Sequence, residues 1–519
     1  MPSAKAGDPL SRIVFDAVWP PERIRTALAG ARLAPYWLED AAALASPARR
    51  PLQGRAVFDL VVVGGGYTGL WTALLAKLRD PALRVAVLEG RTCGWAASGR
   101  NGGFVEASLT HGEENGRSRW PDEYETLERL GQENLDQMEA QLSGLGIDCD
   151  WERTGSLSVA VEPYQVAQLE AICGARPDQA GGAGGAGGAA RADRADRADR
   201  AEARSAPGVL GAAAVRALVN SPTYLAGVWD QDSCALVHPA KLALGLARAA
   251  RESGVEVFEH TRVDGIVRGD RHDGCSGPGG LRLVTEQAVV RAERVALATN
   301  AFPPLLRRYR WHTVPVYDYA LMTEPLSAAQ LASVGWQGRQ GVADMANQFH
   351  YYRLTRDNRI LWGGWDAAYH FGGRMSAAHE DAPGVHAMLA SHFFTTFPDL
   401  DGLRFTHRWA GAIDTCTRFS QFFGAGWGGR AVYAAGFTGL GVGASRFAAR
   451  VMLDLLDGAS TELTELAMTR RAPLPFPPEP LASIGIGATR RALDRADHSG
   501  GRRGLLLKAL DAAGLGFDS

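Results

Sequence analysis

Residues 58–89 read FDLVVVGGGYTGLWTALLAKLRDPALRVAVLE, and this stretch decides the fold. Its opening run, 58–63, is mostly apolar and β-branched, as expected of a strand buried on both faces. Gly64, Gly66 and Gly69 follow with the spacing G-x-G-x-x-G, and an apolar helical segment continues behind them. The order of strand, glycine turn, helix and second strand predicts a parallel βαβ unit.

The glycine turn has the chemistry of a dinucleotide site. Gly64 permits the tight turn, Gly66 lets the backbone approach a pyrophosphate, and Gly69 lets helix and strand pack closely. Phosphates are expected at the helix N-terminus, where unpaired N–H groups and the helix dipole favour negative charge. The second strand, 84–88, ends at Glu89, whose carboxylate can accept hydrogen bonds from both ribose hydroxyls. We therefore predict a dinucleotide without a 2′-phosphate, rather than a simple glycine-rich turn.

The composition excludes several classes of protein. With 519 residues the chain is long enough for several domains or one large two-domain unit. Its 55 basic and 57 acidic residues give a net charge of −2, which offers no footprint for nucleic acid. No apolar run reaches the ~18 residues of a membrane span, and no secretory signal is visible, so we expect a cytoplasmic protein. The six cysteines are scattered, which predicts neither disulfides nor a metal site.

A loop rich in small residues follows Glu89 and reads RTCGWAASGRNGGF over residues 91–104. Its glycines allow the backbone to touch a flat ligand, while Ser98, Arg100 and Asn101 supply polar groups. With GGGYTG and the acidic strand end, its A-S-G-R-N-G-G segment resembles the glycine/D-amino-acid oxidase (DAO) superfamily of flavoproteins, particularly the γ-glutamylputrescine-oxidase-like branch. In that superfamily the loop runs from the FAD pyrophosphate to the isoalloxazine ring. A nicotinamide enzyme would not need it.

Three later segments extend the resemblance. Residues 234–266 contain V-H-P-x-x-L and a following G-V-x-V-x-E, and in the superfamily the backbone of the residue matching Val263 meets the adenine edge. Residues 289–302 close this return to the cofactor domain. Residues 432–443, VYAAGFTGLGVG, precede a helix and place a second positive helix end near the flavin. We interpret His238 as a residue at a helix N-terminus rather than as a catalytic base.

The resemblance implies FAD as the cofactor, and non-covalent binding is expected because Gly411 occupies the place of the cysteine that attaches flavin in sarcosine-oxidase-like relatives. The residues expected to hold FAD are Gly64, Gly66, Tyr67, Thr68, Gly69, Glu89, Ser98, Gly99, Arg100, Asn101, Gly102, Gly103, Val263, Gly436, Thr438, Gly439, Leu440 and Gly441.

The implied fold is α/β, with a Rossmann-like FAD-binding domain of the DAO type and a mainly antiparallel β-sheet substrate domain. An N-terminal arm, 1–57, is expected to lie against the first domain with Trp37 as its apolar anchor. A glycine-rich and RAD-repeat stretch, 174–208, is interpreted as a flexible insertion. The FAD-binding domain is expected at 58–120, 209–302 and 409–460, the substrate domain at 121–173 and 303–408, and a C-terminal tail at 461–519.

Two strand-like alternations, 314–325 and 349–364, are expected side by side in the sheet that roofs the flavin. Their aromatic residues and one arginine are the candidates for contact with the substrate: Tyr317, Tyr319, Tyr352, Arg353 and Trp365. Such an aromatic stripe is more often core than site, so both interpretations stay open. Pro315 and the polar Asp318 favour one edge that faces a cavity.

The expected reaction is a two-electron oxidation of a carbon bearing nitrogen, in which hydride moves to flavin N5 and the imine is hydrolysed. Glycine and D-amino-acid oxidases bind the substrate carboxylate through the arginine of W-x-G-x-R-P, where this chain has Ile413. Unless Arg353 or Arg418 substitutes, a buried carboxylate would stay unpaired at a cost of about 1–3 kcal/mol. An amine is therefore the expected substrate, and Asp414 is either a site for its cationic nitrogen or a structural hydrogen-bond acceptor.

The first hypothesis is an FAD-dependent amine oxidase or dehydrogenase that acts on CH–NH or CH–NH2 donors. Two alternatives stay open: an oxidase or dehydrogenase of amino acids or N-methyl amino acids, and a flavin-binding protein without enzymatic activity. The expected partners are a small-molecule amine and O2 or another electron acceptor, without nucleic acid or membrane. The identity of the amine and the oligomeric state are not predicted.

Overall fold

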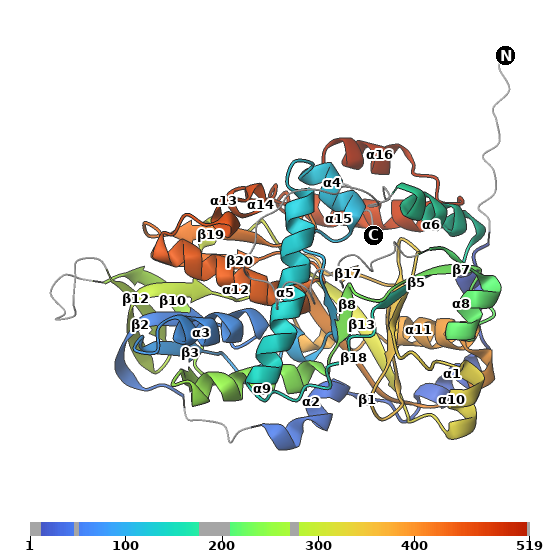
Figure 1. Ribbon diagram of the computed structural model, residues 1–519, viewed down its shortest axis with the longest axis horizontal. Helices are drawn as coiled ribbons and strands as arrows, with labels where there is room; N and C mark the ends of the chain where they lie inside the picture. The colour runs from blue at the N-terminus through green and yellow to red at the C-terminus, as the bar shows by residue number, and fades with distance from the viewer. Residues whose placement is uncertain (1–11, 46–50, 176–207, 270–279, 516–519) are drawn as a thin grey trace, which may run out of the picture.

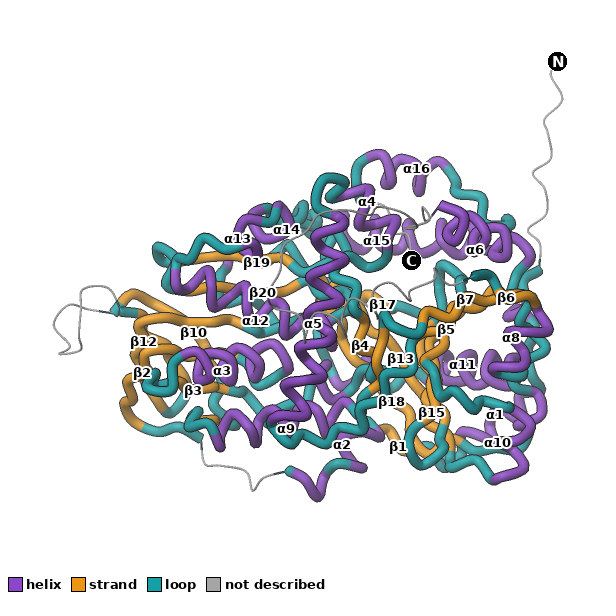
Figure 2. Tube along the Cα trace, viewed as in Figure 1, coloured by secondary structure: helices purple, strands orange, loops and turns teal. Residues whose placement is uncertain are grey.

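The computed structural model of the chain describes residues 12–45, 51–175, 208–269 and 280–515. Most of the expected low-complexity insertion therefore lies outside the described residues. Figure 2 shows that most strands fall into two groups, one towards each end of the molecule, with helices around both, while β4 (Phe104–Glu106) and β8 (Cys234–Leu236) form a separate antiparallel pair. We call these groups and their helices the first and the second lobe.

The sheet of the first lobe contains the βαβ unit predicted from the glycine stretch. Its strand order is β10-β11-β12-β2-β3-β9, with β20 beside β12 and β19 beside β20. The strands are β2 (Gly54–Val63), β3 (Val85–Leu88), β9 (Glu256–Phe258), β10 (Val263–Arg268), β11 (Leu281–Thr285), β12 (Ala288–Leu297), β19 (Phe422–Gly426) and β20 (Ala431–Ala435). Strands β12, β2, β3 and β9 run parallel, so their carboxyl ends meet at one edge.

Four helices cover this sheet: α3 (Tyr67–Arg79), α5 (Tyr124–Gly144), α9 (Pro239–Glu252) and α12 (Gly441–Asp457). In Figure 1, α3 lies between α9 and α12, and α5 crosses in front of the boundary between the lobes. The apolar residues Leu127, Leu135 and Met138 recur at helical spacing and are buried in α5. Helix α5 is therefore amphipathic, with its apolar face in the core of the first lobe.

The sheet of the second lobe is larger and mixed. Its order is β1-β18-β13-β16-β15-β14-β5-β7-β6, with β17 paired to β13. The strands are β1 (Arg32–Leu33), β5 (Ser156–Ala160), β6 (Leu210–Gly211), β7 (Ala226–Asp230), β13 (Val314–Thr323), β14 (Gly341–Asp344), β15 (His350–Leu354), β16 (Ile360–Gly364), β17 (Ala368–Tyr369) and β18 (Phe405–Thr415). The pairs β1–β18 and β14–β5 are parallel, and the central strands β18, β13, β16 and β15 are antiparallel.

The remaining elements pack around these two sheets. They are α1 (Pro21–Leu28), α2 (Tyr36–Asp40), β4 (Phe104–Glu106), α4 (Glu113–Arg119), α6 (Pro163–Ala175), α8 (Ala212–Leu218), β8 (Cys234–Leu236), α10 (Ala328–Val334), α11 (Pro383–Thr396), α13 (Glu462–Glu465), α14 (Ala467–Arg470), α15 (Leu481–Asp497) and α16 (Leu505–Ala512). Helix α11 covers one face of the second sheet through Leu389, Phe393 and Phe394. Within the described ranges, no helix is both long and apolar enough to cross a membrane.

The two lobes divide the chain differently from the expected domain boundaries. Strand β18 stays paired with β13 as far as Thr415, so the boundary expected after residue 408 falls inside a strand of the second sheet. Strands β6 and β7, expected in the FAD-binding domain, also belong to that sheet, while α5 packs on α12 of the first lobe. Strand pairing decides the lobe of a segment, and the order along the chain does not show it.

The N-terminal arm contacts both lobes rather than the first alone. Strand β1 extends the second sheet by pairing with β18. The side chain of Trp37 is 1% exposed and packs in one cluster with Ala240 of α9 and Trp409 of β18. Trp37 is thus an apolar anchor, as expected, but it lies where the two lobes meet.

Candidate active site

A cavity of about 1440 Å³ opens where β2, β3 and β12 end. Its walls include the strand ends Val63 and Leu88, and also Ala298, which follows β12. Open α/β sheets bind ligands at this carboxyl edge. From the expected cofactor residues the cavity wall includes Gly64, Gly66, Tyr67, Thr68, Glu89, Ser98 and Val263.

The three motif glycines differ in what surrounds them. Gly64 has φ +112°, and a Cβ there would lie 2.4 Å from the carbonyl oxygen of Ala298. A Cβ on Gly69 would lie 1.9 Å from the carbonyl oxygen of Gly64, so α3 and its strand leave no room for a side chain. A Cβ on Gly66 would meet only Ser98 Oγ, at 3.0 Å. The open space beside Gly66, the N-cap of α3, fits a pyrophosphate against the helix N-terminus.

Glu89 closes the wall next to this turn. Its carboxylate accepts hydrogen bonds from the backbone N–H of Gly65 at 2.7 Å, the N–H of Arg91 at 2.8 Å and Trp95 Nε1 at 3.0 Å. Burial raises the pKa of the Glu89 carboxyl, while these donors lower it. Carboxylate oxygens have further acceptor sites, so the geometry fits a ribose with two free hydroxyls.

Trp95 and Phe302 are two of the aromatic residues in the cavity wall that were not predicted. Trp95 lies inside the loop that the sequence singled out, and its ring is 5.7 Å from that of Phe302. Phe302 follows β12 in the A-T-N-A-F segment. The available signal was the position of Trp95 within the small-residue loop 91–104, because loops on a rigid scaffold often carry binding residues.

The loop 91–104, which we call the cofactor loop, continues to β4 and is stabilised by hydrogen bonds between its own residues. Asn101 Nδ2 donates to the carbonyl of Ala97 at 2.9 Å, and Asn101 Oδ1 accepts from the N–H of Gly103 at 2.9 Å. A Cβ on Gly99 would lie 2.3 Å from the carbonyl oxygen of Gly94. Gly99, Asn101 and Gly103 therefore shape the loop, and they do not line the large cavity.

Arg100 connects the same loop to the second sheet. Its Nη1 lies 2.6 Å from Glu380 and donates to the carbonyl of Ala410 at 3.0 Å. In return, Trp409 Nε1 donates to the carbonyl of Arg100 at 2.8 Å. The loop and β18 are thus fixed against each other.

The second glycine segment forms the turn into α12. Gly436 donates its N–H to Asp414 Oδ2 at 2.6 Å, and Thr438 Oγ1 donates to the carbonyl of Gly436 at 3.0 Å. Asp414 is thus a hydrogen-bond acceptor for the turn, and burial raises its pKa to about 7. Gly439, Leu440 and Gly441 keep solvent-accessible surface at the N-terminus of α12. These residues lie outside the wall of the large cavity.

The candidate tyrosines lie on the α11 side of the second sheet. Tyr317 and Tyr319 belong to the apolar cluster formed with α11, and their hydroxyls donate to the carbonyls of Ser376 at 3.3 Å and His379 at 2.9 Å. The Tyr352 hydroxyl lies 2.6 Å from that of Tyr224. Trp365 joins the same side by stacking on His350 at 4.9 Å. Tyr319, Tyr352 and Trp365 thus make these contacts on the α11 side, whereas Tyr317 also interacts electrostatically with Arg100 of the loop 91–104.

The two arginines considered for a substrate carboxylate have other partners. Arg353 is 2% exposed, and its Nη1 donates to the carbonyls of Val237 at 2.6 Å and Gly103 at 3.3 Å. Arg418 is also buried and donates to the carbonyl of Met468 at 2.9 Å. Arg353 thus holds the end of the cofactor loop, and Arg418 holds a turn near α14.

On strands β13 and β15, the residues next to the candidate tyrosines point to the other face of the sheet, towards the cofactor loop. Tyr351, the neighbour of Tyr352, donates its hydroxyl to Asp318. A Cβ on Gly102 would lie 2.7 Å from the Tyr351 ring, so the loop and the ring are in contact. Sequence reasoning missed Tyr351, although the period of two along a strand was the signal that separates it from Tyr352.

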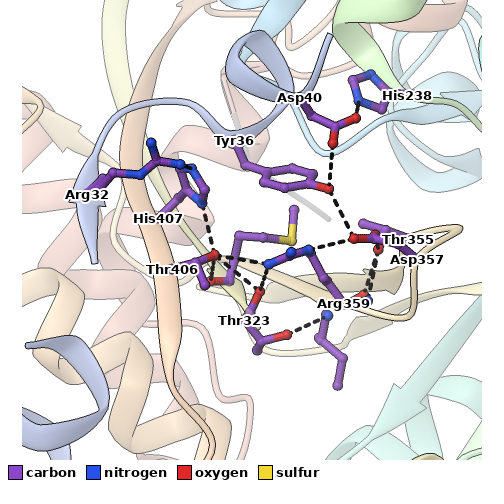
Figure 3. Close-up of polar contacts among 12 residues, drawn as sticks. Arg32, Tyr36, Asp40, His238, Thr323, Thr355, Asp357, Arg359, Thr406 and His407 are labelled. Atoms are coloured by element: carbon purple, nitrogen blue, oxygen red, sulfur yellow. Dashed lines mark hydrogen bonds and ion pairs between the residues drawn. The ribbon is translucent and has the colours of Figure 1, made fainter. Parts of the chain in front are cut away.

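A second, smaller cavity of about 240 Å³ lies between α2, α9 and the end of β15. Figure 3 shows Asp40 between Tyr36 and His238, at 3.2 Å and 3.1 Å from their polar atoms. His238 Nδ1 accepts from the N–H of Lys241, and burial lowers the pKa of His238 to about 4. His238 is therefore a neutral N-cap of α9, which confirms its expected place at a helix N-terminus, and this cluster anchors the arm.

Comparison with known proteins agrees with this architecture. The DAO family, described as FAD dependent oxidoreductase, matches residues 59–455. The gamma-glutamylputrescine oxidoreductase of Escherichia coli K12 is 30% identical over 80% of this chain and 88% of its own length. The probable oxidoreductase OrdL of Haemophilus influenzae is 27% identical over 78% of this chain and 84% of its own.

A solved structure gives the same result for the fold. Glycine oxidase from Geobacillus kaustophilus superimposes with a TM-score of 0.60 at 20% identity, over 80% of this chain and 99% of that one. The expected α/β fold, the FAD cofactor and the enzyme class are confirmed. The chain belongs to the DAO family of FAD-dependent oxidoreductases.

Proposed function

We propose that this protein oxidises a carbon–nitrogen bond of a cationic amine. A carbon next to nitrogen loses a hydride, and water hydrolyses the imine to a carbonyl compound and either ammonia, from a primary amine, or an amine, from a secondary one. FAD, when bound, accepts the hydride and passes the electrons to O2 or another acceptor. Because the relative from Escherichia coli is named for γ-glutamylputrescine, that compound or an amine like it is the proposed substrate.

The proposed cofactor contacts lie at two places, the N-terminus of α3 and the N-terminus of α12. The N-terminus of α3 beside Gly66 would hold the pyrophosphate, and Glu89 would hold the ribose. Val263 lines the same cavity and would meet the adenine. At the other end, Gly439 and the N-terminus of α12 would face the flavin, where helix N–H groups favour developing negative charge.

One observation carries the choice of an amine over an amino acid. Ile413 lies opposite Val316 in the β18–β13 pair, on the face of the sheet that meets the cofactor loop. An isoleucine there offers nothing to an α-carboxylate, and Arg353 and Arg418 are held by backbone carbonyls. An α-amino acid would therefore bury an unpaired carboxylate, at a cost of about 1–3 kcal/mol.

Non-covalent flavin binding is part of the proposal. Gly411 has no side chain to form a link, and the thiol of Cys416 is buried and donates to the carbonyl of Ser420 at 3.1 Å. Precipitation of the purified protein with acid should release all of the yellow colour into the supernatant. Flavin that stays with the denatured pellet would contradict non-covalent binding.

The function is tested by anaerobic absorbance spectroscopy of the FAD-loaded protein. γ-Glutamylputrescine, putrescine, glycine, sarcosine and D-alanine would be added separately while the flavin band is followed. Bleaching by an amine but not by the amino acids is the expected result, and admission of air then separates an oxidase from a dehydrogenase. Bleaching by amino acids alone would support the alternative, and bleaching by no compound would favour a flavin-binding protein without this activity.

A further inference from the structure

Asp318 is an isolated carboxylate in the middle of β13. Its neighbours on the same face of this strand are apolar, among them Val316 and Ala320. Among the residues that the structure describes, no lysine, arginine or histidine forms an ion pair with Asp318, and its side-chain partner is the Tyr351 hydroxyl. A carboxylate that is largely removed from solvent and has no counter-ion is costly in a folded protein. Asp318 is therefore a candidate partner for a cation from outside the described residues.

The residues directly opposite Asp318 and Tyr351 on the neighbouring strands are glycines. Gly411 lies directly opposite Asp318 on β18, and Gly363 lies opposite Tyr351 on β16. Neither glycine covers the carboxylate with a side chain. Although they lie in central strands, Asp318, Tyr351 and Gly411 retain solvent-accessible surface. Asp318 therefore keeps accessible surface, and it lies on the side of the sheet that bears the cofactor loop.

The side chain of Tyr351 lies between Asp318 and the cofactor loop. The Tyr351 ring touches Gly102 and lies edge-on to Phe104, with ring centroids 5.9 Å apart. A Cβ on Gly411 would lie 3.5 Å from Arg100 Cβ. Asp318 is thus enclosed between the sheet and the loop expected to hold the flavin ring.

We propose that Asp318, oriented by the Tyr351 hydroxyl, is the site that receives the protonated nitrogen of the substrate. This inference rests on the proposed function and extends it, because it assigns the recognition of the amine to two named residues. The ammonium donates a hydrogen bond to the Asp318 carboxylate, and opposite charges make this bond stronger than a neutral one. An α-amino acid would bring its carboxylate towards the same acid and towards Ile413, so the pair selects against it.

The same contact provides an acceptor for the proton that must leave the nitrogen. The N–H bond breaks, the proton moves to an oxygen of Asp318, and the electron pair stays on nitrogen, where it is needed to form the C=N bond. Burial raises the pKa of Asp318 to about 6, while hydrogen bonds from Tyr351 and from backbone N–H groups lower it. An acceptor with a pKa near neutrality suits this step.

The charged groups of the packed elements do not neutralise Asp318. On the cofactor loop, Arg100 is paired with Glu380 at 2.6 Å. On β15, Arg353 donates to the carbonyls of Val237 and Gly103. Tyr351 is the titratable group in direct contact, and burial beside Asp318 raises its pKa well above the usual value, so it stays a donor.

The test compares Asp318→Asn with a matched carboxylate on the opposite side of the sheet. Asparagine keeps the shape and an acceptor for Tyr351 but removes the charge. Asp366→Asn is the control, because Asp366 pairs with Arg490 at 2.8 Å and lies near Tyr319 of the α11 side. Both variants would be loaded with FAD, and the half-saturating concentration of γ-glutamylputrescine would be measured by anaerobic bleaching. We expect a rise of about 10- to 100-fold for Asp318→Asn and no change for Asp366→Asn.

Tyr351→Phe supplies a second readout that does not depend on the loss of charge. Without the hydroxyl donor the carboxylate is less stabilised, so its pKa rises. The acidic limb of the bleaching rate against pH should therefore move to higher pH in Tyr351→Phe and disappear in Asp318→Asn. Unchanged FAD content and far-UV circular dichroism would show that each variant is folded.

The outcomes separate this inference from the proposed function. If γ-glutamylputrescine bleaches the wild type and Asp318→Asn with equal half-saturation, the inference is overturned while the proposed function stands. If no amine bleaches the wild type, the flavin band is followed for a spectral shift on addition of putrescine or butylamine, with butanol as the uncharged control. A shift that is lost in Asp318→Asn supports the inference without the function, and the absence of any shift overturns both.

Discussion

The two faces of the second sheet, built from the same strands, have opposite chemistry. The face under α11 carries large aromatic residues that are closed off from solvent, such as Tyr352 and Trp362. The face towards the cofactor loop carries glycines, Ile413 and the lone carboxylate Asp318. Side chains alternate between faces, so one residue along a strand changes a core position into a site position. The aromatic residues under α11 form a closed core, whereas the other face combines aromatic residues such as Tyr351 and Trp409 with glycines and the carboxylate of Asp318.

Trp362→Ala should produce the largest effect on stability. Trp362 is fully buried on the α11 face, where its ring stacks on Tyr352 at 4.5 Å and lies edge-on to Phe393. We expect a loss of about 3–5 kcal/mol in the free energy of unfolding, measured by urea denaturation. The control is Val316→Ala on the opposite face, with an expected loss of about 1 kcal/mol. A larger loss for Val316→Ala would contradict the assignment of core and site.

Ile413→Arg should produce the largest effect on amine oxidation. The new guanidinium would lie on the cofactor-facing side of β18, two residues from Gly411, and would pair with Asp318 and repel a cationic amine. The half-saturating concentration of γ-glutamylputrescine should rise about 100-fold, equivalent to about 2.7 kcal/mol. Ile413→Leu, which keeps an apolar side chain, should leave it nearly unchanged. Equal values for the two variants would show that Ile413 does not face the substrate.

The neighbours Tyr351 and Tyr352 give the most direct comparison of the two faces. Tyr352→Phe leaves the buried hydroxyl of Tyr224 without its partner and should reduce the free energy of unfolding by about 1–2 kcal/mol. Its half-saturation for the amine should change less than about twofold. Tyr351→Phe should change the kinetics more than the stability. Urea denaturation and anaerobic bleaching of both variants would check this, and the same pattern for both would remove the distinction.

The smallest expected effect is a difference in pH dependence. On the α11 face, burial lowers the pKa of His386 from 6.5 to about 4, so between these values only the unfolded chain binds the proton. Stability is therefore lost as the pH falls from 6.5 towards 4. Burial raises the pKa of Asp318 from 3.8 to about 6, so between these values the folded chain holds the extra proton. The contribution of Asp318 to the free energy of unfolding therefore changes with pH in the opposite direction, and it decreases as the pH rises.

Without the Asp318 carboxyl, the loss of stability that His386 causes on acidification should be easier to measure. Between pH 6 and pH 4, Asp318→Asn should lose stability on acidification more steeply than the wild type, by about 1 kcal/mol per pH unit. Urea denaturation at pH 4.5, 5.5 and 6.5 would measure it. Parallel curves for the two proteins would mean that Asp318 does not bind a proton in this range.

Local sequence was sufficient to predict the structure of the cofactor-binding end of the molecule. The strand, the glycine turn, α3 and Glu89 lie within one short stretch, and each requirement there is set by neighbours along the chain. A glycine is needed at Gly64 because φ is +112°, and at Gly69 because a side chain would meet the turn itself. Such requirements leave their mark on residue type and spacing, so the family and the cofactor were predicted and are confirmed.

The structure around the expected substrate site was harder to predict from the sequence. Alternation places Tyr317 and Tyr319 on one face, but it does not say which face is covered, because the covering helix α11 comes from residues far along the chain. The partners of Arg353 were equally hidden, since the carbonyls of Gly103 and Val237 reach it only after both lobes have packed. The boundary after residue 408 failed for the same reason: β18 continues as long as β13 pairs with it.

The sequence by itself determined the dinucleotide motif, its glycines and acid, and the family, because these depend on backbone conformation and contacts within a few turns of chain. Only the tertiary structure decided which side of the second sheet meets the cofactor loop, and so distinguished Asp318 and Tyr351 from the tyrosines beside them. The physical reason is that a strand presents two equivalent faces until other segments bury one of them.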